Sequence, residues 1–296
     1  PISEIMKKYD AIVVGSGISG MTLALLLGAQ GKSVLLLEKS ATIGGSMARF
    51  RKQGIPLDTG FHFTGGFAEG GILSDMLIVL GLADEIEPQF VVDPADNCFI
   101  FEDSRRRYEF SLGTESAIAS LKRYFPGQYA GIDAYFNRAR RVCEGTVSMD
   151  LRTITLSARP LEEDYISLRE VLDEAITDPE LKALLSAYTM CYGTPPSEVS
   201  FAVHSRVSYN LYESVARVKG GGEAFIKAFR RRFAEYDIDV RVGAYITDCS
   251  DVKDRQVMSF GLNNGERVAA DNCIFTIHPR HVLEILPKEH LSKAFV

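Results

Sequence analysis

The stretch Asp10-Ala11-Ile12-Val13-Val14-Gly15-Ser16-Gly17-Ile18-Ser19-Gly20 decides how this chain folds. Its apolar run predicts a buried strand, and its glycines follow at G-x-G-x-x-G spacing before a helical pattern that continues to Gln30. After Gly31, a second apolar run, Val34 to Leu37, ends on the acid Glu38. The order strand, glycine-rich turn, helix, strand and acid predicts a βαβ unit shaped for a dinucleotide.

Each glycine of the turn has a physical reason to be there. Gly15 allows a tight turn, and Gly17 has no Cβ, so the backbone can come close to a pyrophosphate. The helix that begins there directs its unpaired N–H groups, those of Ile18 and Ser19 among them, and its positive dipole end at the phosphates. Gly20 lets the helix pack closely against the strand. A glycine turn without a ligand is the alternative, and the flanking strands, helix and acid in register argue against it.

The residues that follow indicate which dinucleotide is bound. Glu38 ends the second strand about twenty residues after the turn, where an acceptor for the ribose 2′-hydroxyl is needed and where an acid disfavours a 2′-phosphate. Lys39 comes next, and Gly44-Gly45-Ser46 brings the backbone back toward the ligand. An NAD domain would enter its next helix soon after the acid, so the second glycine pair favours FAD over NAD.

Composition and charge restrict the class of protein. With 296 residues, 46% of them hydrophobic and 24% charged, the chain is long enough for one large or two ordinary globular domains. A net charge of -6 argues against nucleic acid as a partner. The short basic clusters at 105–107, 138–141 and 230–232 are interpreted as solvated faces, and contact of one of them with a membrane surface or an anionic ligand stays open as the alternative.

Targeting signals and metal sites are not predicted. No apolar stretch reaches the length of about 18 residues that a membrane span requires, and the N-terminus does not read as a secretory signal. His278 and His281 are separated by Pro279, which breaks the helical face that a metal pair would need. Unpaired cysteines predict reduced thiols and a cytoplasmic setting, and they are Cys98, Cys143, Cys191, Cys249 and Cys273.

The rest of the chain predicts an inserted domain. Residues 88–110 alternate apolar and polar, which suggests a small antiparallel sheet, and residues 116–188 have a helical period. Ile72 to Leu82 and Glu223 to Phe233 read as helices, and strand signals follow the second of these. We therefore expect an α/β fold, a Rossmann-type FAD-binding domain with a central parallel sheet, into which a mostly helical cap or substrate domain with a small antiparallel sheet is inserted. The expected boundaries are 1–87 and 215–296 for the FAD-binding domain and 88–214 for the cap.

By these residues the chain resembles the FAD-dependent phytoene desaturase, carotenoid isomerase and retinol saturase group, within the wider amine-oxidase-like flavoprotein superfamily. The matches to the flavin motif are Gly15 to Gly20, Glu38 and Gly44-Gly45-Ser46. The matches particular to the retinol saturase subgroup are Leu57-Asp58-Thr59-Gly60-Phe61-His62 and Tyr192-Gly193-Thr194-Pro195-Pro196-Ser197-Glu198 with Phe201 and His204. Lys219 to Glu223 and Asp271 to Pro279 are similar to the family's returning segment, and Ile246 looks like the position whose backbone meets the adenine.

The resemblance implies hydride exchange between flavin N5 and a carbon of a long, conjugated, apolar substrate. Such chemistry needs few acids or bases, which agrees with the lack of a paired-carboxylate, Ser-His or Cys-His constellation in the sequence. His62, Tyr192 and His204 are the candidates for the substrate pocket, and a structural role, as a hydrogen-bonded histidine or a packed tyrosine, is the alternative for each. An amine or porphyrinogen oxidase and a flavin-binding scaffold without turnover are the competing functions.

One departure from the family affects these expectations. Members of the family end with a second glycine-rich segment that contacts the flavin, and this sequence contains none. We expect either that the chain is part of a longer protein or that its flavin binding is impaired. Pro1 to Ile5, which precede a natural start at Met6, are expected not to belong to the native protein.

Overall fold

The computed structural model describes residues 6–93, 97–149, 151, 159–254, 256–288 and 291–292. The chain forms two compact units, which are treated separately below. The first unit contains the described residues up to His62, the short segment Asp84–Ile86, and the described residues from Lys219 onward. The second unit contains Phe63–Ala83 and Glu87–Val218.

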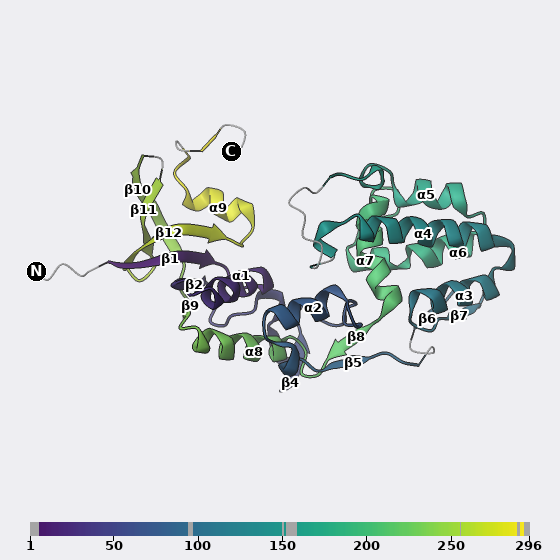
Figure 1. The fold of residues 1–296 in the computed structure, drawn as a ribbon, viewed down its shortest axis with the longest axis horizontal. Helices are drawn as coiled ribbons and strands as arrows, with labels where there is room; N and C mark the ends of the chain where they lie inside the picture. Colours follow the sequence, from purple (N-terminus) through teal and green to yellow (C-terminus); the bar gives the residue numbers. More distant parts are fainter. Residues whose placement is uncertain are drawn as a thin grey trace, which may run out of the picture. The chain divides into compact units, whose positions relative to one another are not determined.

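A six-stranded sheet forms the centre of the first unit, with the strand order β10-β11-β12-β1-β2-β9 (Figure 1). β1 pairs in parallel with β12 and β2, and β2 pairs in parallel with β9, whereas β10, β11 and β12 are joined by antiparallel pairing. These strands are β1 (Lys7–Val14), β2 (Val34–Glu38), β9 (Asp239–Val242), β10 (Ile246–Lys253), β11 (Gln256–Leu262) and β12 (Arg267–Phe275). The parallel part of this sheet confirms the Rossmann-type α/β fold that the sequence predicts.

The apolar runs that predicted β1 and β2 form neighbouring strands in the interior of this sheet. Ile12, Val13 and Leu35 to Leu37 are fully buried, as expected of parallel strands that are covered on both faces. The helix α1 (Ile18–Ala29) packs on β1 and β2 and also contacts α8 (Gly222–Glu235). The first βαβ unit is therefore built as its sequence predicts, and the carboxyl ends of β1 and β2 lie beside the start of α1.

Shorter elements complete the first unit. The hairpin of β3 (Arg49–Lys52) and β4 (Ile55–Asp58) follows the second glycine pair, and α9 (Pro279–Ile285) follows β12. β10 begins at Ile246, and residues 243–245 form a loop between β9 and β10.

The second unit is mostly helical, as predicted, and it has two small antiparallel pairs of strands where the sequence predicts one small sheet over residues 88–110. Its helices are α2 (Ile72–Val79), α3 (Thr114–Tyr124), α4 (Tyr129–Glu144), α5 (Leu168–Ala175), α6 (Pro179–Ser186) and α7 (Phe201–Glu213). Its strand pairs are β5 (Pro88–Phe90) with β8 (Ala216–Val218) and β6 (Cys98–Ile100) with β7 (Arg107–Glu109). Short 3₁₀ turns in the two units lie at Gly45–Met47, Ala83–Glu85, Pro126–Gln128, Val147–Met149, Glu162–Asp164 and Ala187–Cys191.

Aromatic side chains dominate the core of the second unit. Tyr135 and Phe136 on α4 are fully buried and meet Phe201 and Tyr212 on α7 through edge-to-face ring contacts. Such ring pairs contribute about 0.5–1.5 kcal/mol each beyond the burial of their surface. The helical periodicity of residues 116–188 therefore reflects a packed aromatic core.

Candidate nucleotide-binding site

The turn between β1 and α1 has the geometry of an anion-binding helix end. Gly15 has φ +97°, in the left-handed region that favours glycine, and α1 begins at Ile18 with Gly17 as its N-cap. No side chain accepts a hydrogen bond from the first turn at this cap. Since the first N–H groups of an α-helix have no acceptor within the helix, the turn presents free donors and the positive end of the dipole.

Gly17 and Gly20 are required for different reasons. A Cβ on Gly20 would lie 1.9 Å from the carbonyl oxygen of Gly15, so the fold itself excludes a side chain there. A Cβ on Gly17 would meet nothing within 4 Å, and the φ of Gly17, −63°, suits any residue. Neither packing nor backbone strain explains a glycine at position 17. The position that its Cβ would fill therefore stays open, directly at the helix N-terminus, where an anion would be favoured.

Glu38 lies at the carboxyl end of β2 and is tied to the same turn. Its Oε2 accepts hydrogen bonds from the backbone N–H of Ser16 at 3.0 Å and from the Ser16 hydroxyl at 2.6 Å, and its Oε1 accepts one from the N–H of Ser40 at 2.7 Å. Burial alone would raise the pKa of Glu38, but these hydrogen bonds outweigh it and leave the pKa below its usual range. The carboxylate is therefore ionised at neutral pH and fixed beside the glycine turn.

The second glycine pair lies against the first. The N–H of Gly44 donates to the carbonyl of Ser16 at 3.0 Å, and a Cβ on Gly45 would lie 3.0 Å from the Cα of Gly17. Gly45 has φ +53°, so glycine suits both its conformation and this close approach. The carbonyl of Ser46 accepts the N–H of Gly60 at 3.1 Å, which holds the segment in place. The structure thus brings together the two glycine segments that are separated in the sequence.

The loop that precedes β10 closes the other side of Glu38. The N–H of Gly243 donates to the carbonyl of Ser40 at 2.8 Å, and the N–H of Ala244 donates to the carbonyl of Glu38 at 2.9 Å. Lys39 places its Nζ 5.6 Å from the ring centre of Tyr245. Ile246, the next residue, is buried at the start of β10 and pairs with Leu262. These contacts bring the 243–246 backbone next to the acid at the end of β2.

Thr276 supports the turn, and sequence reasoning gave it no role in the site. Its Oγ1 lies 3.0 Å from the carbonyl oxygen of Val14 and 3.1 Å from that of Gly15, and its N–H donates to Val14 at 2.9 Å. A Cβ on Gly20 would also lie 2.8 Å from this hydroxyl. The signal that could have found Thr276 is its position at the end of a buried strand, because such strands end at the same edge of a parallel sheet as β1.

His204, a candidate for the substrate pocket, is buried in the core of the second unit. Its Nε2 lies 3.0 Å from the carbonyl oxygen of Leu185 and 3.1 Å from the hydroxyl of Tyr135, and its Nδ1 lies 2.6 Å from the hydroxyl of Tyr192. A carbonyl can only accept, so Nε2 carries the proton and Nδ1 accepts the phenolic proton of Tyr192. Burial lowers the pKa of His204 to about 4, although the bond to Leu185 opposes this. His204 is thus a neutral histidine that ties α7 to its neighbours.

The three pocket candidates are distributed over both units. Tyr192 is half-buried and contacts His204 in the second unit, whereas His62 lies in the first unit with an exposed side chain. Within the described ranges, no group of three or more His, Cys, Asp or Glu side chains is arranged to hold a metal ion. Of the helices in that same part of the chain, none combines the length and the apolar character needed to cross a bilayer.

Comparison with known proteins agrees with this geometry. Residues 13–77 match the family described as the NAD(P)-binding Rossmann-like domain. The chain is 30% identical to the all-trans-retinol 13,14-reductase of Danio rerio over 235 residues, which covers 74% of this chain and 39% of the reductase. It is 27% identical to the hydroxyneurosporene desaturase of Rubrivivax gelatinosus over 287 residues, which covers 93% of this chain and 54% of the desaturase.

A solved structure shows the same fold. An oxidoreductase from Methanosarcina mazei superposes with a TM-score of 0.69 at 17% identity, covering 97% of this chain and 64% of that chain. Of the two sequence relatives, the chain spans less than two fifths of the length of the retinol reductase and about half the length of the desaturase.

Proposed function

We propose that this chain, which is 30% identical to a retinol reductase and 27% identical to a hydroxyneurosporene desaturase over the matched regions, is an FAD-dependent oxidoreductase for a conjugated, apolar substrate of the polyene or isoprenoid type. When bound, FAD supplies hydride exchange at flavin N5, for desaturation, saturation or isomerisation. The observation that carries the proposal is the open side of Gly17 at an uncapped helix N-terminus beside the ionised Glu38.

The residues of the glycine turn would bind the diphosphate. Gly15 sets the turn, Gly17 leaves room for phosphate oxygens, and the backbone N–H groups of Ile18 and Ser19 would donate hydrogen bonds to them. Gly20 lets α1 come close enough to β1 for this orientation. None of these contacts requires a charged side chain, so the turn would bind the diphosphate at any pH at which the protein folds.

The residues at the end of β2 would bind the adenosine half. The Glu38 carboxylate accepts hydrogen bonds from ribose hydroxyls and repels a 2′-phosphate. The backbone at Ile246 would meet the adenine, with Lys39 beside it over the ring of Tyr245. Gly44, Gly45 and Ser46 would lie beside the diphosphate, since a Cβ on Gly45 would come within 3.0 Å of the Cα of Gly17.

The substrate class is inferred from the relatives, whose names specify retinol and hydroxyneurosporene. Both are extended apolar molecules, and binding them requires apolar surface more than acids or bases. We assign the substrate to the cap of residues 88–214 and the cofactor to residues 1–87 and 215–296. Tyr192 is the polar candidate for substrate contact within the cap, and the buried His204 holds its hydroxyl through a hydrogen bond.

The test of this proposal is cofactor binding followed by turnover. Protein mixed with FAD and separated by gel filtration is expected to retain the visible absorption of bound flavin. Gly17→Val should abolish retention, whereas Gly127→Val, also at a site with nothing within 4 Å and no positive φ, should retain it. Consumption of a polyene such as a retinoid, with an amine left unchanged under the same conditions, is the expected activity. Equal retention by both variants, or turnover of the amine alone, would overturn the proposal.

We extend the proposal to peripheral contact with a membrane, where apolar substrates partition. The β3–β4 hairpin exposes Phe50 and Ile55 by 50% and 61%, and Arg51 and Lys52 lie between them in the sequence. An apolar surface flanked by cations suits the boundary of an anionic bilayer. Phe50→Ser with Ile55→Ser should reduce cosedimentation with anionic vesicles, and Val92→Ser, which changes an exposed residue of the second unit, should not. Equal sedimentation of all three proteins contradicts the extension.

A further inference from the structure

The loop of residues 243–245, between β9 and β10, is positioned by a side chain from another part of the sheet. Through its own N–H groups the loop holds the carbonyls of Glu38 and Ser40, as described above. Gly243 and Tyr245 are exposed, so packing does little to fix them. The loop therefore needs polar contacts to keep one conformation.

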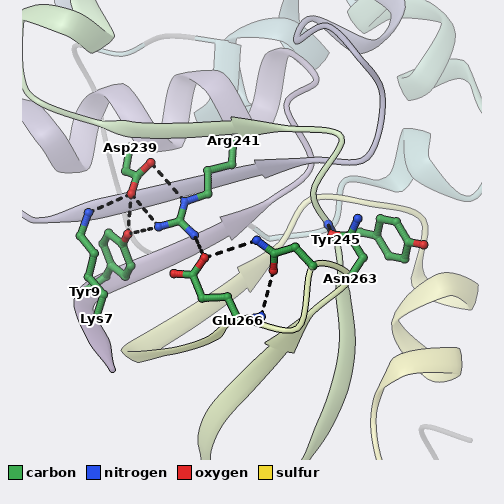
Figure 2. Close-up of polar contacts among 8 residues, drawn as sticks. Lys7, Tyr9, Asp239, Arg241, Tyr245, Asn263 and Glu266 are labelled. Carbon is green, nitrogen blue, oxygen red and sulfur yellow. Dashed lines mark hydrogen bonds and ion pairs between the residues drawn. The ribbon is translucent and has the colours of Figure 1, made fainter. Parts of the chain in front are cut away.

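Asn263, in the turn between β11 and β12, supplies these contacts. Its Oδ1 accepts the N–H of Tyr245 at 3.1 Å, and its Nδ2 donates to the carbonyl of Gly243 at 3.0 Å. Its backbone N–H also donates to the carbonyl of Tyr245 at 3.1 Å. One donor and one acceptor of a single amide thus grip both ends of the loop, and Figure 2 shows Asn263 beside Tyr245. We propose that Asn263 is a positioning residue that fixes the adenosine end of the cofactor site.

The turn that carries Asn263 is itself anchored. Glu266, at the other end of the turn, accepts a hydrogen bond from Nη1 of Arg241 at 2.7 Å. Arg241 in turn donates to Asp239 at 3.0 Å and to the hydroxyl of Tyr9 at 2.9 Å (Figure 2). This network connects β1, β9 and the β11–β12 turn. It therefore fixes the position of the turn that carries Asn263.

The neighbouring Asn264 provides a matched control. Its Oδ1 accepts the N–H of Glu266 at 3.0 Å and its Nδ2 lies 3.5 Å from a Glu266 carboxylate oxygen, and the structure records no hydrogen bond between its side chain and the described 243–245 loop. Both asparagines lie in one turn and carry the same side chain. A substitution at 264 therefore tests the turn alone, and one at 263 tests the turn together with the side-chain hydrogen bonds to the 243–245 loop.

This inference rests on the proposed binding of FAD and deepens it, because it concerns only the adenosine half of the cofactor. The experiment measures the dissociation constant of ADP and of FAD by calorimetry for the unchanged chain, Asn263→Ala, Asn263→Asp and Asn264→Ala. Asn263→Ala removes two exposed hydrogen bonds to the loop, so we expect it to raise both constants by about fivefold or more. Asn263→Asp keeps the acceptor for Tyr245 and should lie between, while Asn264→Ala should stay within about twofold.

Hydrogen exchange at the backbone amide of Tyr245 gives a second readout that needs no ligand. This amide should exchange faster in Asn263→Ala than in the unchanged chain and in Asn264→Ala. Unchanged ADP affinity in Asn263→Ala, or an equal loss in both alanine variants, overturns the inference. If the unchanged chain binds neither ADP nor FAD, the proposed function fails. Faster hydrogen exchange of the Tyr245 amide in Asn263→Ala would then still show that Asn263 holds the loop.

Discussion

Protonation of His204 is expected to destabilise the helical unit in mildly acidic solution. The folded ring is neutral, because Nε2–H faces the Leu185 carbonyl and Nδ1 accepts from Tyr192. In the unfolded chain the same ring has its ordinary pKa of 6.5, whereas burial lowers the folded pKa to about 4. Between these two values the unfolded state binds more protons, so stability falls as the pH falls through this window.

The size of the effect follows from the two pKa values. They differ by about 2.5 units, and each unit corresponds to about 1.36 kcal/mol, so the free energy of unfolding should fall by about 3 kcal/mol between pH 6.5 and pH 4. Carboxylates with lowered pKa, such as Asp239 at about 2, act in the same direction but below this window. The loss between pH 6.5 and 4 is therefore attributable mainly to the histidine.

Urea unfolding at a series of pH values measures this loss. Circular dichroism is a suitable signal, because the chain contains no tryptophan and the second unit is mostly helical. His204→Gln keeps a donor and an acceptor but does not titrate, so its stability should change far less across the window. His62→Gln removes an exposed histidine and should keep the full dependence. A His204→Gln protein that loses as much stability as the unchanged chain would refute the reasoning.

Substitutions in the first unit give further predictions. Gly17→Val should leave the circular dichroism and melting temperature unchanged but abolish FAD retention, and a clear fall in melting temperature would contradict this. Gly20→Ala should instead lower the free energy of unfolding by about 1–3 kcal/mol, because the new Cβ meets the Gly15 carbonyl; a neutral result in urea would contradict that clash. Glu38→Ala should raise the dissociation constant of FAD at least about tenfold in calorimetry, and unchanged affinity would count against its ribose role. Asp239→Asn should cost about 1–2 kcal/mol in urea at pH 7 and much less near pH 2, where the carboxyl itself becomes protonated.

The sequence predicted those parts of the fold whose causes are local. The apolar runs of β1 and β2, the glycines between them and the acid at position 38 lie within one short segment, and each has a reason that can be stated without the rest of the chain. The helices α2 and α8 were likewise visible as 3.6-residue patterns. Such signals identify the elements and the nucleotide motif, because backbone conformation and one-sided burial are encoded at short range.

Contacts between distant residues could not be predicted in the same way. Thr276 supports a turn that lies 261 residues away at Gly15, and no local pattern indicates which strand end it reaches. His204 shows the same limit, because a histidine on a helix predicts neither a tautomer nor a partner at Leu185. The 243–245 loop likewise depends on Asn263, which lies 18 residues beyond Tyr245 in the sequence and reaches the loop only because strands β10 and β11 pair.

Glu38 illustrates why the cofactor site needs several variants to be understood. The motif suggests that this acid serves the ribose, yet in the protein its Oε2 already binds the backbone and hydroxyl of Ser16. Loss of Glu38 would therefore weaken the turn as well as the ligand contact, and reduced FAD binding alone could not distinguish the two. Gly17→Val fills the space for the diphosphate, and Asn263→Ala removes the side-chain hydrogen bonds that hold the loop beside Glu38, and neither substitution removes the carboxylate itself. If both weaken FAD binding while the melting temperature holds, the acid's contribution to binding can be separated from its contribution to the fold.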